Sequence, residues 1–322
     1  MIKKERKKPI AIPMLEALIR RLPTDHPKIP LLHKELAKRK KGYKGEMALD
    51  YYLRFLPNKK YSILHDIRLP DSENFFQIDT LLVSPNFLLI LEVKNISGTL
   101  LFDDDFKQMI RILNNEEEGM ASPFLQARRH RYQLQGWLEE RKLSNPPIVY
   151  LVVISNPKTI IKAPKSSLHF KMIHSANLPF MIEKIEKRHS KECLTNRDIK
   201  KLVGLINRNH TPEQPDFFQQ FSIEKSEIVK GVHCPNCCSF SMNRHYGNWF
   251  CKQCSTKSKD AHLHALNDYF LLIAPTITNQ QLRDFLQFPS SSVSSKLLQS
   301  MNLDHTGNTK GRKYKIPHPN IT

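Results

Sequence analysis

The sequence predicts an α/β protein with a mixed sheet flanked by helices, followed by a small cysteine-rich module and a helical C-terminal module. Three observations predict this order. Short runs rich in Leu, Ile and Val alternate with turn residues between 61 and 102, helical patterns flank them, and four cysteines at paired spacing follow. With 322 residues, 40% of them hydrophobic, the chain can bury a sizeable core in more than one domain.

The formal charge of +19 is the strongest global feature and indicates a polyanionic partner, most simply nucleic acid. The alternatives are a basic protein without such a partner and one that contacts an anionic membrane surface. No apolar run approaches the roughly eighteen residues that a membrane span needs. The basic amino terminus also lacks an adjoining apolar stretch with a small-residue cleavage site. We therefore expect a cytoplasmic protein that does not enter the membrane.

Residues 1–43 are expected to form a basic arm. Met1–Lys44 hold fourteen Lys or Arg and four acidic residues, a net charge of +10. Such a segment can bind phosphates without reading bases. Repeated prolines predict an extended arm with one short helix near 14–21, and a second helical pattern covers 31–41.

The predicted sheet follows a helix that starts at Gly45-Glu46. Its strands are expected at 61–69, 75–83, 87–93 and 98–102. An acidic surface segment comes next, and then an amphipathic helix with Ser122 as its N-cap and Pro123 in its first turn. The apolar run PIVYLVVIS is typical of a strand that is buried on both faces.

Three ionisable side chains lie inside the central apolar runs. Asp79 falls on one strand, and Glu92 and Lys94 fall on the next, two residues apart and so on the same face. Buried charge is costly unless it is paired or binds a metal. Two carboxylates with open water positions suit Mg²⁺ or Mn²⁺, which could polarise a phosphodiester and activate water beside Lys94. The alternative is an ion pair between Glu92 and Lys94 at a sheet edge, with Asp79 solvated.

Other polar groups could join this site. Glu46 could supply a third acidic residue, or it could only stabilise the start of its helix through the helix dipole. The helix after Ser122 carries several polar and basic residues in its first turns, where cations oppose the dipole. A phosphate partner would help to explain these cations, and a solvated charged face is the alternative. The residues in question are Gln126, Arg128, Arg129, His130 and Arg131.

Residues 44–155 resemble the NERD family, the nuclease-related domain, which is placed in the PD-(D/E)xK nuclease superfamily. The matching pieces are the Gly45-Glu46 pair, QIDTLLVS, LEVKN, SGTL and SPFLQARRH. The resemblance implies a restriction-endonuclease-like sheet. Ile78 precedes the aspartate, as is common in this family.

The resemblance also implies roles for individual residues. Asp79 and Glu92 would be metal ligands, and Lys94 would be the catalytic lysine. Glu46 and Gln126 would be supporting site residues. Nucleases of this superfamily are often dimers, so a homodimer is a further expectation.

Four cysteines form two C-x-x-C pairs, Cys234 with Cys237 and Cys251 with Cys254, with thirteen residues between the pairs. Two such turns predict a tetrahedral Zn²⁺ site. Because four thiolates leave no open position, this zinc is expected to be structural. The segment 231–258 resembles a zinc ribbon.

Residues near these cysteines extend the prediction. The aromatic side chains of Tyr246, Trp249 and Phe250 are expected to cover the metal. Cys238 is interpreted as a spare thiol and Cys193 as a core cysteine, since disulfides are rare in reducing compartments. A neighbouring histidine is an alternative ligand.

Residues 261–322 are expected to form a helix-turn-helix or winged-helix module that binds DNA. A helical pattern covers 261–274, a second helix is capped by TNQQ, and a serine-rich helix follows Pro289-Ser290. The tail then carries Lys310, Arg312 and Lys313, as a basic β-wing would. A small helical cap with a basic tail is the alternative.

Together these features predict a Mg²⁺- or Mn²⁺-dependent deoxyribonuclease that works in DNA processing or repair. The nuclease-like domain would span 44–206, with its core at 44–155, and a linker would cover 207–230. The competing hypothesis is a DNA-binding protein or repair adaptor whose nuclease-like domain is inactive. An RNA-processing enzyme is a third hypothesis.

Overall fold

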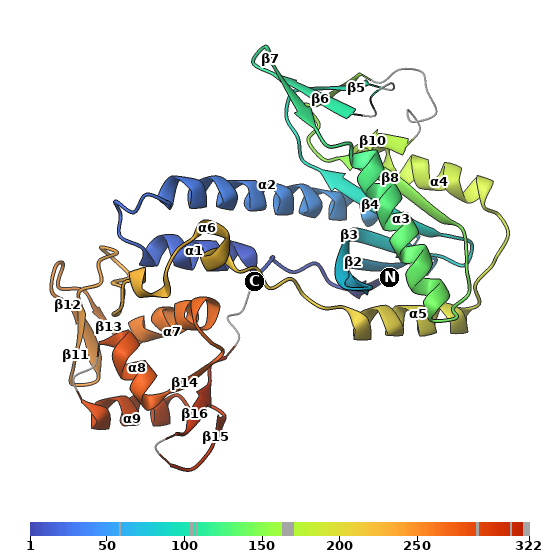
Figure 1. Cartoon of the computed structure of the whole chain (residues 1–322). Coiled ribbons are helices and arrows are strands. Elements are labelled where there is room, and N and C mark those ends of the chain that lie inside the picture. Colours follow the sequence, from blue (N-terminus) through green and yellow to red (C-terminus); the bar gives the residue numbers. More distant parts are fainter. Residues whose placement is uncertain are drawn as a thin grey trace. The chain divides into compact units, whose positions relative to one another are not determined.

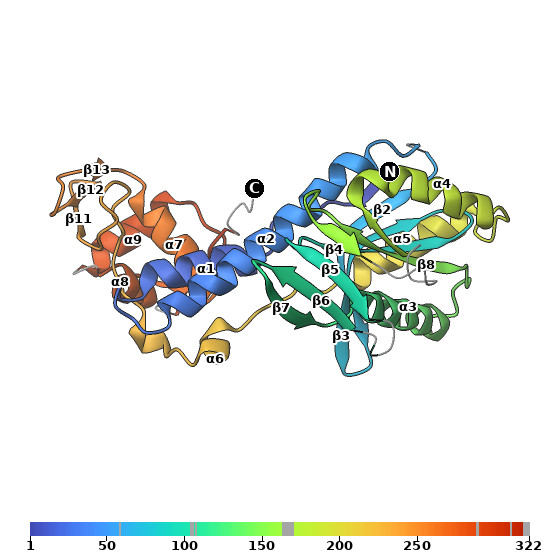
Figure 2. The same cartoon turned by 90° about the horizontal axis from the view of Figure 1, so that it is seen from above.

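The computed structural model describes residues 1–57, 59–103, 106, 108–162, 171–287, 290–309 and 311–317. The chain divides into two compact units (Figures 1 and 2). Unit 1 comprises Met1–Lys7 and Lys40–Glu213, and unit 2 comprises Lys8–Arg39 and Gln214–Thr322. Within the described ranges, no helix has the length and apolar character needed to cross a membrane.

A mixed six-stranded sheet forms the centre of unit 1 and confirms the predicted α/β class. Neighbouring strands are antiparallel from β2 to β4 and parallel from β4 to β10, and β1 is parallel to β2. In spatial order the strands are β1 (Ile2–Lys4), β2 (Ser62–Asp71), β3 (Asn74–Val83), β4 (Leu88–Lys94), β8 (Ile148–Ile154) and β10 (Met172–His174).

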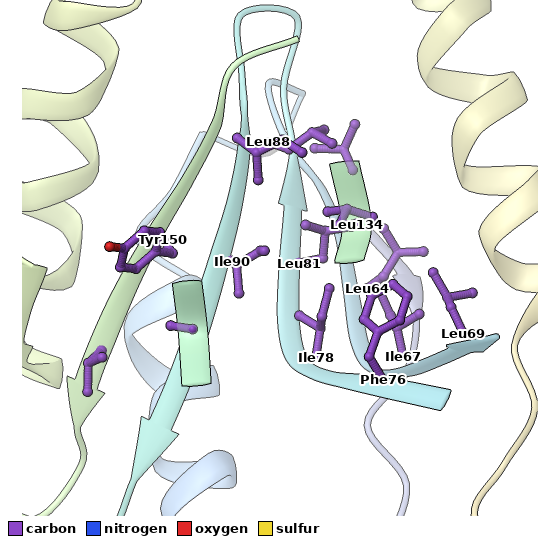
Figure 3. Packing of buried hydrophobic residues seen from close by; sticks show 14 of the residues in the cluster. Leu64, Ile67, Leu69, Phe76, Ile78, Leu81, Leu88, Ile90, Leu134 and Tyr150 are labelled. Atoms are coloured by element: carbon purple, nitrogen blue, oxygen red, sulfur yellow. The ribbon is translucent and has the colours of Figure 1, made fainter. Parts of the chain in front are cut away.

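Helices cover both faces of this sheet. Side chains of α3 (Pro123–Glu140) and α5 (Asn196–Asn209) pack on one face. Figure 3 shows Leu88, Ile90 and Leu134 of that cluster. The other face packs against α2 (Ile29–Leu53) and α4 (Leu178–Arg188), which follows the 3-10 turn η2 (Ser175–Asn177). The sheet core is therefore closed on both sides.

A second, four-stranded sheet differs from the sequence prediction. The predicted strand at 98–102 corresponds to β5 but lies in this separate sheet, and the predicted acidic surface segment contains the β6–β7 hairpin. The turn between β6 and β7 has positive φ at Asn114 and Asn115, which is typical of a tight hairpin. In spatial order the strands are β7 (Glu116–Met120), β6 (Gln108–Leu113), β5 (Thr99–Asp103) and β9 (Ile160–Lys162).

The prediction that a helix starts at Gly45-Glu46 was wrong, because α2 runs without a break from Ile29 to Leu53. Gly45 serves close packing instead. A Cβ at this position would lie 2.6 Å from Asn95 Cβ and 2.7 Å from Ser155 Oγ. Asn95 and Ser155 directly follow β4 and β8. Glycine thus lets α2 approach the ends of the two central strands.

Unit 2 contains helices and two small three-stranded sheets, ordered β11-β12-β13 and β14-β16-β15. The elements before and within the cysteine-rich segment are α1 (Ala11–Arg21), α6 (Phe217–Phe221), η3 (Lys225–Glu227), β11 (Met242–His245), β12 (Asn248–Cys251) and β13 (Lys257–Ser258). The elements after it are α7 (Ala261–Leu272), β14 (Thr276–Thr278), α8 (Asn279–Leu286), α9 (Ser291–Ser300), β15 (His305–Thr306) and β16 (Lys313–Lys315).

The amino-terminal residues do not form the extended arm that was expected. Residues 2–4 add β1 to the sheet of unit 1, whereas 8–39 belong to unit 2. The reason is the apolar stripe of α1, which buries Leu15 and Leu18, and the buried ion pair between Arg21 and Asp268 of α7. The region predicted as a linker likewise contains α6, whose Phe217 is buried.

Candidate functional site

Asp79, in the middle of β3, lies against the backbone at the end of β4, between Glu92 and Lys94. The last paired residues of these strands are Thr80 and Leu91, so Asp79 and Glu92 are the next residues beyond that pair. Asp79 Oδ2 accepts a hydrogen bond of 2.8 Å from the Val93 backbone N–H. The structure thus places Asp79 near Glu92, on the neighbouring strand, as the sequence led us to expect.

Lys94 connects Glu92 to α3. Its Nζ donates to Glu92 Oε1 at 2.7 Å and to Gln126 Oε1 at 2.9 Å. The Glu92 side chain is only 2% exposed, whereas that of Lys94 is 27% exposed. A buried carboxylate is therefore paired with a cation that water can reach, and Gln126 helps to fix the position of that cation.

His130 is a site residue that the sequence analysis missed. Its buried Nδ1 lies 3.3 Å from Glu92 Oε2, although the two atoms do not form a well-directed hydrogen bond. In the sequence, His130 stands between Arg129 and Arg131, which face solvent. Helical spacing could have placed His130 in the site, because Gln126 and His130 are four residues apart and lie on one helix face.

The two carboxylates differ in their affinity for protons. Burial raises the pKa of Asp79 well above its ordinary value, and the nearby charges of Glu92 and Glu46 raise it further. Burial also acts to raise the pKa of Glu92, but His130 and Lys94 outweigh it and hold this pKa below its ordinary value. Opposite shifts in neighbouring carboxyl groups are typical of functional sites.

Glu46 approaches from α2, on the opposite face of the sheet from α3. Its Oε2 accepts a hydrogen bond of 2.6 Å from Arg6 Nη1, and the same nitrogen lies 3.5 Å from the Asp79 carbonyl oxygen. Burial raises the pKa of Glu46 to about 7, against the opposing effect of Arg6. Glu46 is therefore an interior residue of α2 linked to the site through Arg6, and the prediction that it lies at a helix start is wrong.

Arg6 was also missed from the sequence. Its side chain is 4% exposed, and it donates hydrogen bonds to Asp50, to Glu46 and to Thr80 Oγ1, and contacts His65 Nδ1. Its position comes from the short β1 strand, which holds the amino-terminal segment against β2. No motif connects a residue so near the amino terminus with the central strands.

The donor set at Asp79 and Glu92 fits a hard divalent cation. Glu92 Oε2 is buried and has no hydrogen-bond partner among the described residues, so an added cation would satisfy it. Carboxylate oxygens are preferred ligands of Mg²⁺. In the described part of the chain, only the four cysteines bring three or more His, Cys, Asp or Glu ligand atoms within 4.8 Å of one another. Asp79 and Glu92 would thus leave further positions to water and substrate.

The basic residues predicted on α3 are exposed. Arg128, Arg129 and Arg131 all reach solvent. Arg128 Nε donates to Tyr132 Oη at 3.2 Å, and its guanidinium lies over the Tyr132 ring. Ser122 occupies the N-cap position but makes no side-chain capping hydrogen bond.

In unit 2, the four predicted cysteines converge. Cys234 Sγ lies 3.6 Å from Cys254 Sγ, and Cys237 Sγ lies 3.5 Å from Cys251 Sγ. Four sulfurs bound tetrahedrally to zinc at ~2.3 Å would be about 3.8 Å apart. Backbone N–H groups also donate to Cys234 and Cys251. The cluster is compatible with a structural zinc in a zinc ribbon.

The surroundings of the cluster differ in part from expectation. Trp249 is buried and donates from Nε1 to His262 Nδ1. Tyr246 is fully exposed, so its ring does not cover the cluster as expected, and Phe250 is 36% exposed. Cys193 is exposed, so its interpretation as a core cysteine was wrong.

The basic residues predicted after α9 are described in part. Arg312 Nε donates to the Gly307 carbonyl at 3.2 Å, and Lys313 is an exposed residue of β16. Lys310 and Pro289 lie outside the described residues.

Residues 41–155 match the model of the nuclease-related domain, NERD. The matched segment begins within α2 and ends directly after β8. This confirms the resemblance stated from the sequence and indicates a nuclease-like function for the domain. The comparison with curated proteins and the comparison with solved structures gave no match. The matched segment contains Glu46, Asp79, Glu92, Lys94, Gln126 and His130.

Proposed function

We propose that unit 1 is a metal-dependent nuclease that hydrolyses phosphodiester bonds in DNA. The observation that carries this proposal is the convergence of Asp79 from the middle of β3, Glu92 and Lys94 from the end of β4, and Gln126 from the first turn of α3. All four residues fall within the segment that matches the nuclease-related domain.

Asp79 and Glu92 would hold Mg²⁺ or Mn²⁺, which when bound supplies Lewis-acid polarisation of the phosphodiester and a more acidic water. The raised pKa of Asp79 and the lowered pKa of Glu92 give the pair a net charge that depends on pH. A cation would favour the doubly ionised pair, because it offsets the repulsion between the two carboxylates.

Lys94 would act as the catalytic lysine. Glu92 and Gln126 hold its Nζ in place before substrate binds, so a positive charge is already positioned beside the carboxylates. A positioned cation stabilises negative charge that develops on phosphate oxygens in the transition state. His130 would help to keep Glu92 ionised, since its Nδ1 lies 3.3 Å from Glu92 Oε2.

The remaining features support nucleic acid as the substrate class. The formal charge of +19 favours a polyanion, and Arg128, Arg129 and Arg131 are exposed on the helix that supplies Gln126. We further propose that Cys234, Cys237, Cys251 and Cys254 bind a structural zinc, and that residues 261–317 form a winged-helix module. A role in DNA repair, action in the cytoplasm and a homodimeric state are part of the same proposal.

A second candidate function is a DNA-binding protein or repair adaptor that does not cleave. The ion pair between Lys94 and Glu92 favours it, because this pair satisfies both charges without a metal. Substitution of Lys94 separates the two candidates.

The test is cleavage of labelled duplex, single-stranded and branched DNA, and of RNA, with Mg²⁺ or Mn²⁺. It compares the parent with Lys94→Ala and with the control Lys187→Ala, which changes an exposed lysine paired with Glu183. The nuclease proposal expects Lys94→Ala to keep DNA binding and lose cleavage, while the control keeps both. Tight DNA binding without cleavage in all three proteins would favour the adaptor.

A further inference from the structure

A polar groove of about 930 Å³ lies in unit 2 between α8, α9 and the loop that joins β15 to β16. One wall is α8, which contributes Asn279, Gln280 and Arg283. The facing wall is α9, which contributes Ser291, Ser295 and Gln299. Amide, hydroxyl and guanidinium groups therefore line a space that is large enough for part of a polar macromolecule.

The periodicity of α9 explains why its small polar residues face the groove. Ser291, Ser295 and Gln299 are four residues apart and so share one helix face. The opposite face buries Leu297 and Leu298 in the core of the module. This division makes α9 a helix whose apolar side is fixed by packing and whose polar side faces the groove.

Hydrogen bonds fix the geometry of the two walls. Asn279 Nδ2 donates to Ser295 Oγ at 2.9 Å, and Ser294 Oγ donates to Asn279 Oδ1 at 3.0 Å. Thr278 and Gln281 form a capping box at the start of α8. The groove is thus preorganised, which lowers the entropic cost of binding.

Arg283 is the observation that points to a bound partner. It lines the groove, and its Nε is buried and has no hydrogen-bond partner in the part of the chain that the structure describes. A buried donor without an acceptor is unfavourable, and a bound acceptor would satisfy it. Arg312 adds a second guanidinium from the β15–β16 loop. The only acid among the lining residues, Asp284, is neutralised by Lys230 at 2.8 Å.

The composition of the groove favours a partner with both donors and acceptors. A site that binds only phosphate would be lined mainly by cations. This lining also includes the amides of Asn279, Gln280, Gln287 and Gln299. Amide side chains donate and accept at once and match the edges of bases. The major groove of B-form DNA admits a helix, whereas that of A-form RNA is too narrow for side chains to read.

We propose that this groove binds duplex DNA and selects its base sequence. In this arrangement α9 presents Gln299 and Ser295 to base edges, while Arg283 and Arg312 bind the phosphate backbone. The site goes beyond the proposed nuclease function, because it requires no catalysis and uses none of the residues around Asp79. It would determine which duplexes the protein engages.

The experiment uses the full chain with Asp79→Asn, so that bound DNA is not cut. Duplexes with a randomised central segment are selected for binding and sequenced, and affinities for a recovered and a scrambled duplex are then measured by fluorescence anisotropy at several salt concentrations. The variants Gln299→Ala and Arg312→Ala are added separately. The matched control is Gln220→Ala, an exposed glutamine of α6 that does not line the groove.

The proposal expects the parent to enrich a defined sequence. Gln299→Ala should weaken binding to the recovered duplex by about 5- to 150-fold and leave the scrambled duplex unchanged. Arg312→Ala should weaken binding to both duplexes and reduce the salt slope by about 1. Because Gln299 is exposed, its variant should keep the melting temperature of the parent.

Three results would overturn the proposal. They are the absence of any sequence enrichment, equal behaviour of Gln299→Ala and Gln220→Ala, and preferential binding of single-stranded DNA or RNA. Failure of the nuclease proposal would not affect this outcome, because binding is measured in a protein that is not required to cleave.

Discussion

Substituting the two helix glycines of α2 tests how this helix is held against the site. Gly42 and Gly45 lie in the same helix, but they differ in their surroundings. A Cβ at Gly42 would meet nothing within 4 Å. A Cβ at Gly45 would lie 2.6 Å from Asn95 Cβ and 2.7 Å from Ser155 Oγ, well inside van der Waals contact.

The expected magnitudes follow from two opposing effects. Replacing glycine by alanine inside a helix stabilises it by about 1 kcal/mol, so Gly42→Ala should raise the free energy of unfolding by this amount. Gly45→Ala gains the same preference but overpacks its contact, which costs about 1–3 kcal/mol. Asn95 Cβ cannot move away without a shift of the backbone. The two variants should therefore differ by about 1–3 kcal/mol, with Gly45→Ala the less stable.

Denaturation by urea at fixed pH measures both variants against the parent through the midpoint and slope of the transition. Equal stabilisation by Gly42→Ala and Gly45→Ala would refute the close approach of α2 to the ends of β4 and β8. If the reasoning holds, Gly45→Ala should also impair cleavage, because it displaces the helix that carries Glu46.

Other predictions concern stability. Arg6→Ala should lower the free energy of unfolding by about 3 kcal/mol, because it leaves partly buried carboxylates unpaired, and unchanged denaturation would contradict this. Burial lowers the pKa of His262 from 6.5 to about 4. The unfolded chain then binds the proton first, so stability should rise between pH 4 and 6.5, and His262→Gln should flatten part of that rise. If the stability of His262→Gln rose with pH as steeply as that of the parent, the lowered pKa of His262 would be contradicted. Removal of zinc by a chelator should lower the melting temperature, as should Cys251→Ser, and metal analysis should find zinc in the untreated protein. A zinc-free protein that melts unchanged with chelator would rule out the structural zinc.

The main site residues could be predicted because they depend on local periodicity. Asp79, Glu92 and Lys94 interrupt apolar runs, and alternation along a strand places Glu92 and Lys94 on the same face. The cysteine pairs were also predictable, since two short turns determine where four thiolates point. In each case, nearby residues in the sequence carry most of the geometry.

The features that were missed depend on contacts between distant residues. Gly45 resembles a helix boundary in the sequence, but its role is to let Asn95 and Ser155 pack closely against α2. Arg6 reaches the site only because β1 joins the sheet. His130 was hidden among exposed arginines, and only the orientation of α3 directs it toward Glu92. Tertiary packing decides all three, and local patterns do not encode it.

The most direct test of the central claim is the Mg²⁺-dependent cleavage rate of Asp79→Asn. This substitution keeps the size of the side chain and removes the charge that would hold the metal. Asp198→Asn is the matched control, because Asp198 is a half-exposed residue at the start of α5, in unit 1 but outside the site, where it hydrogen-bonds to the N-cap Thr195. We predict metal-dependent cleavage by the parent and the control, and a loss of about 100-fold or more in Asp79→Asn. Equal cleavage by all three proteins, or cleavage independent of metal, would contradict the account.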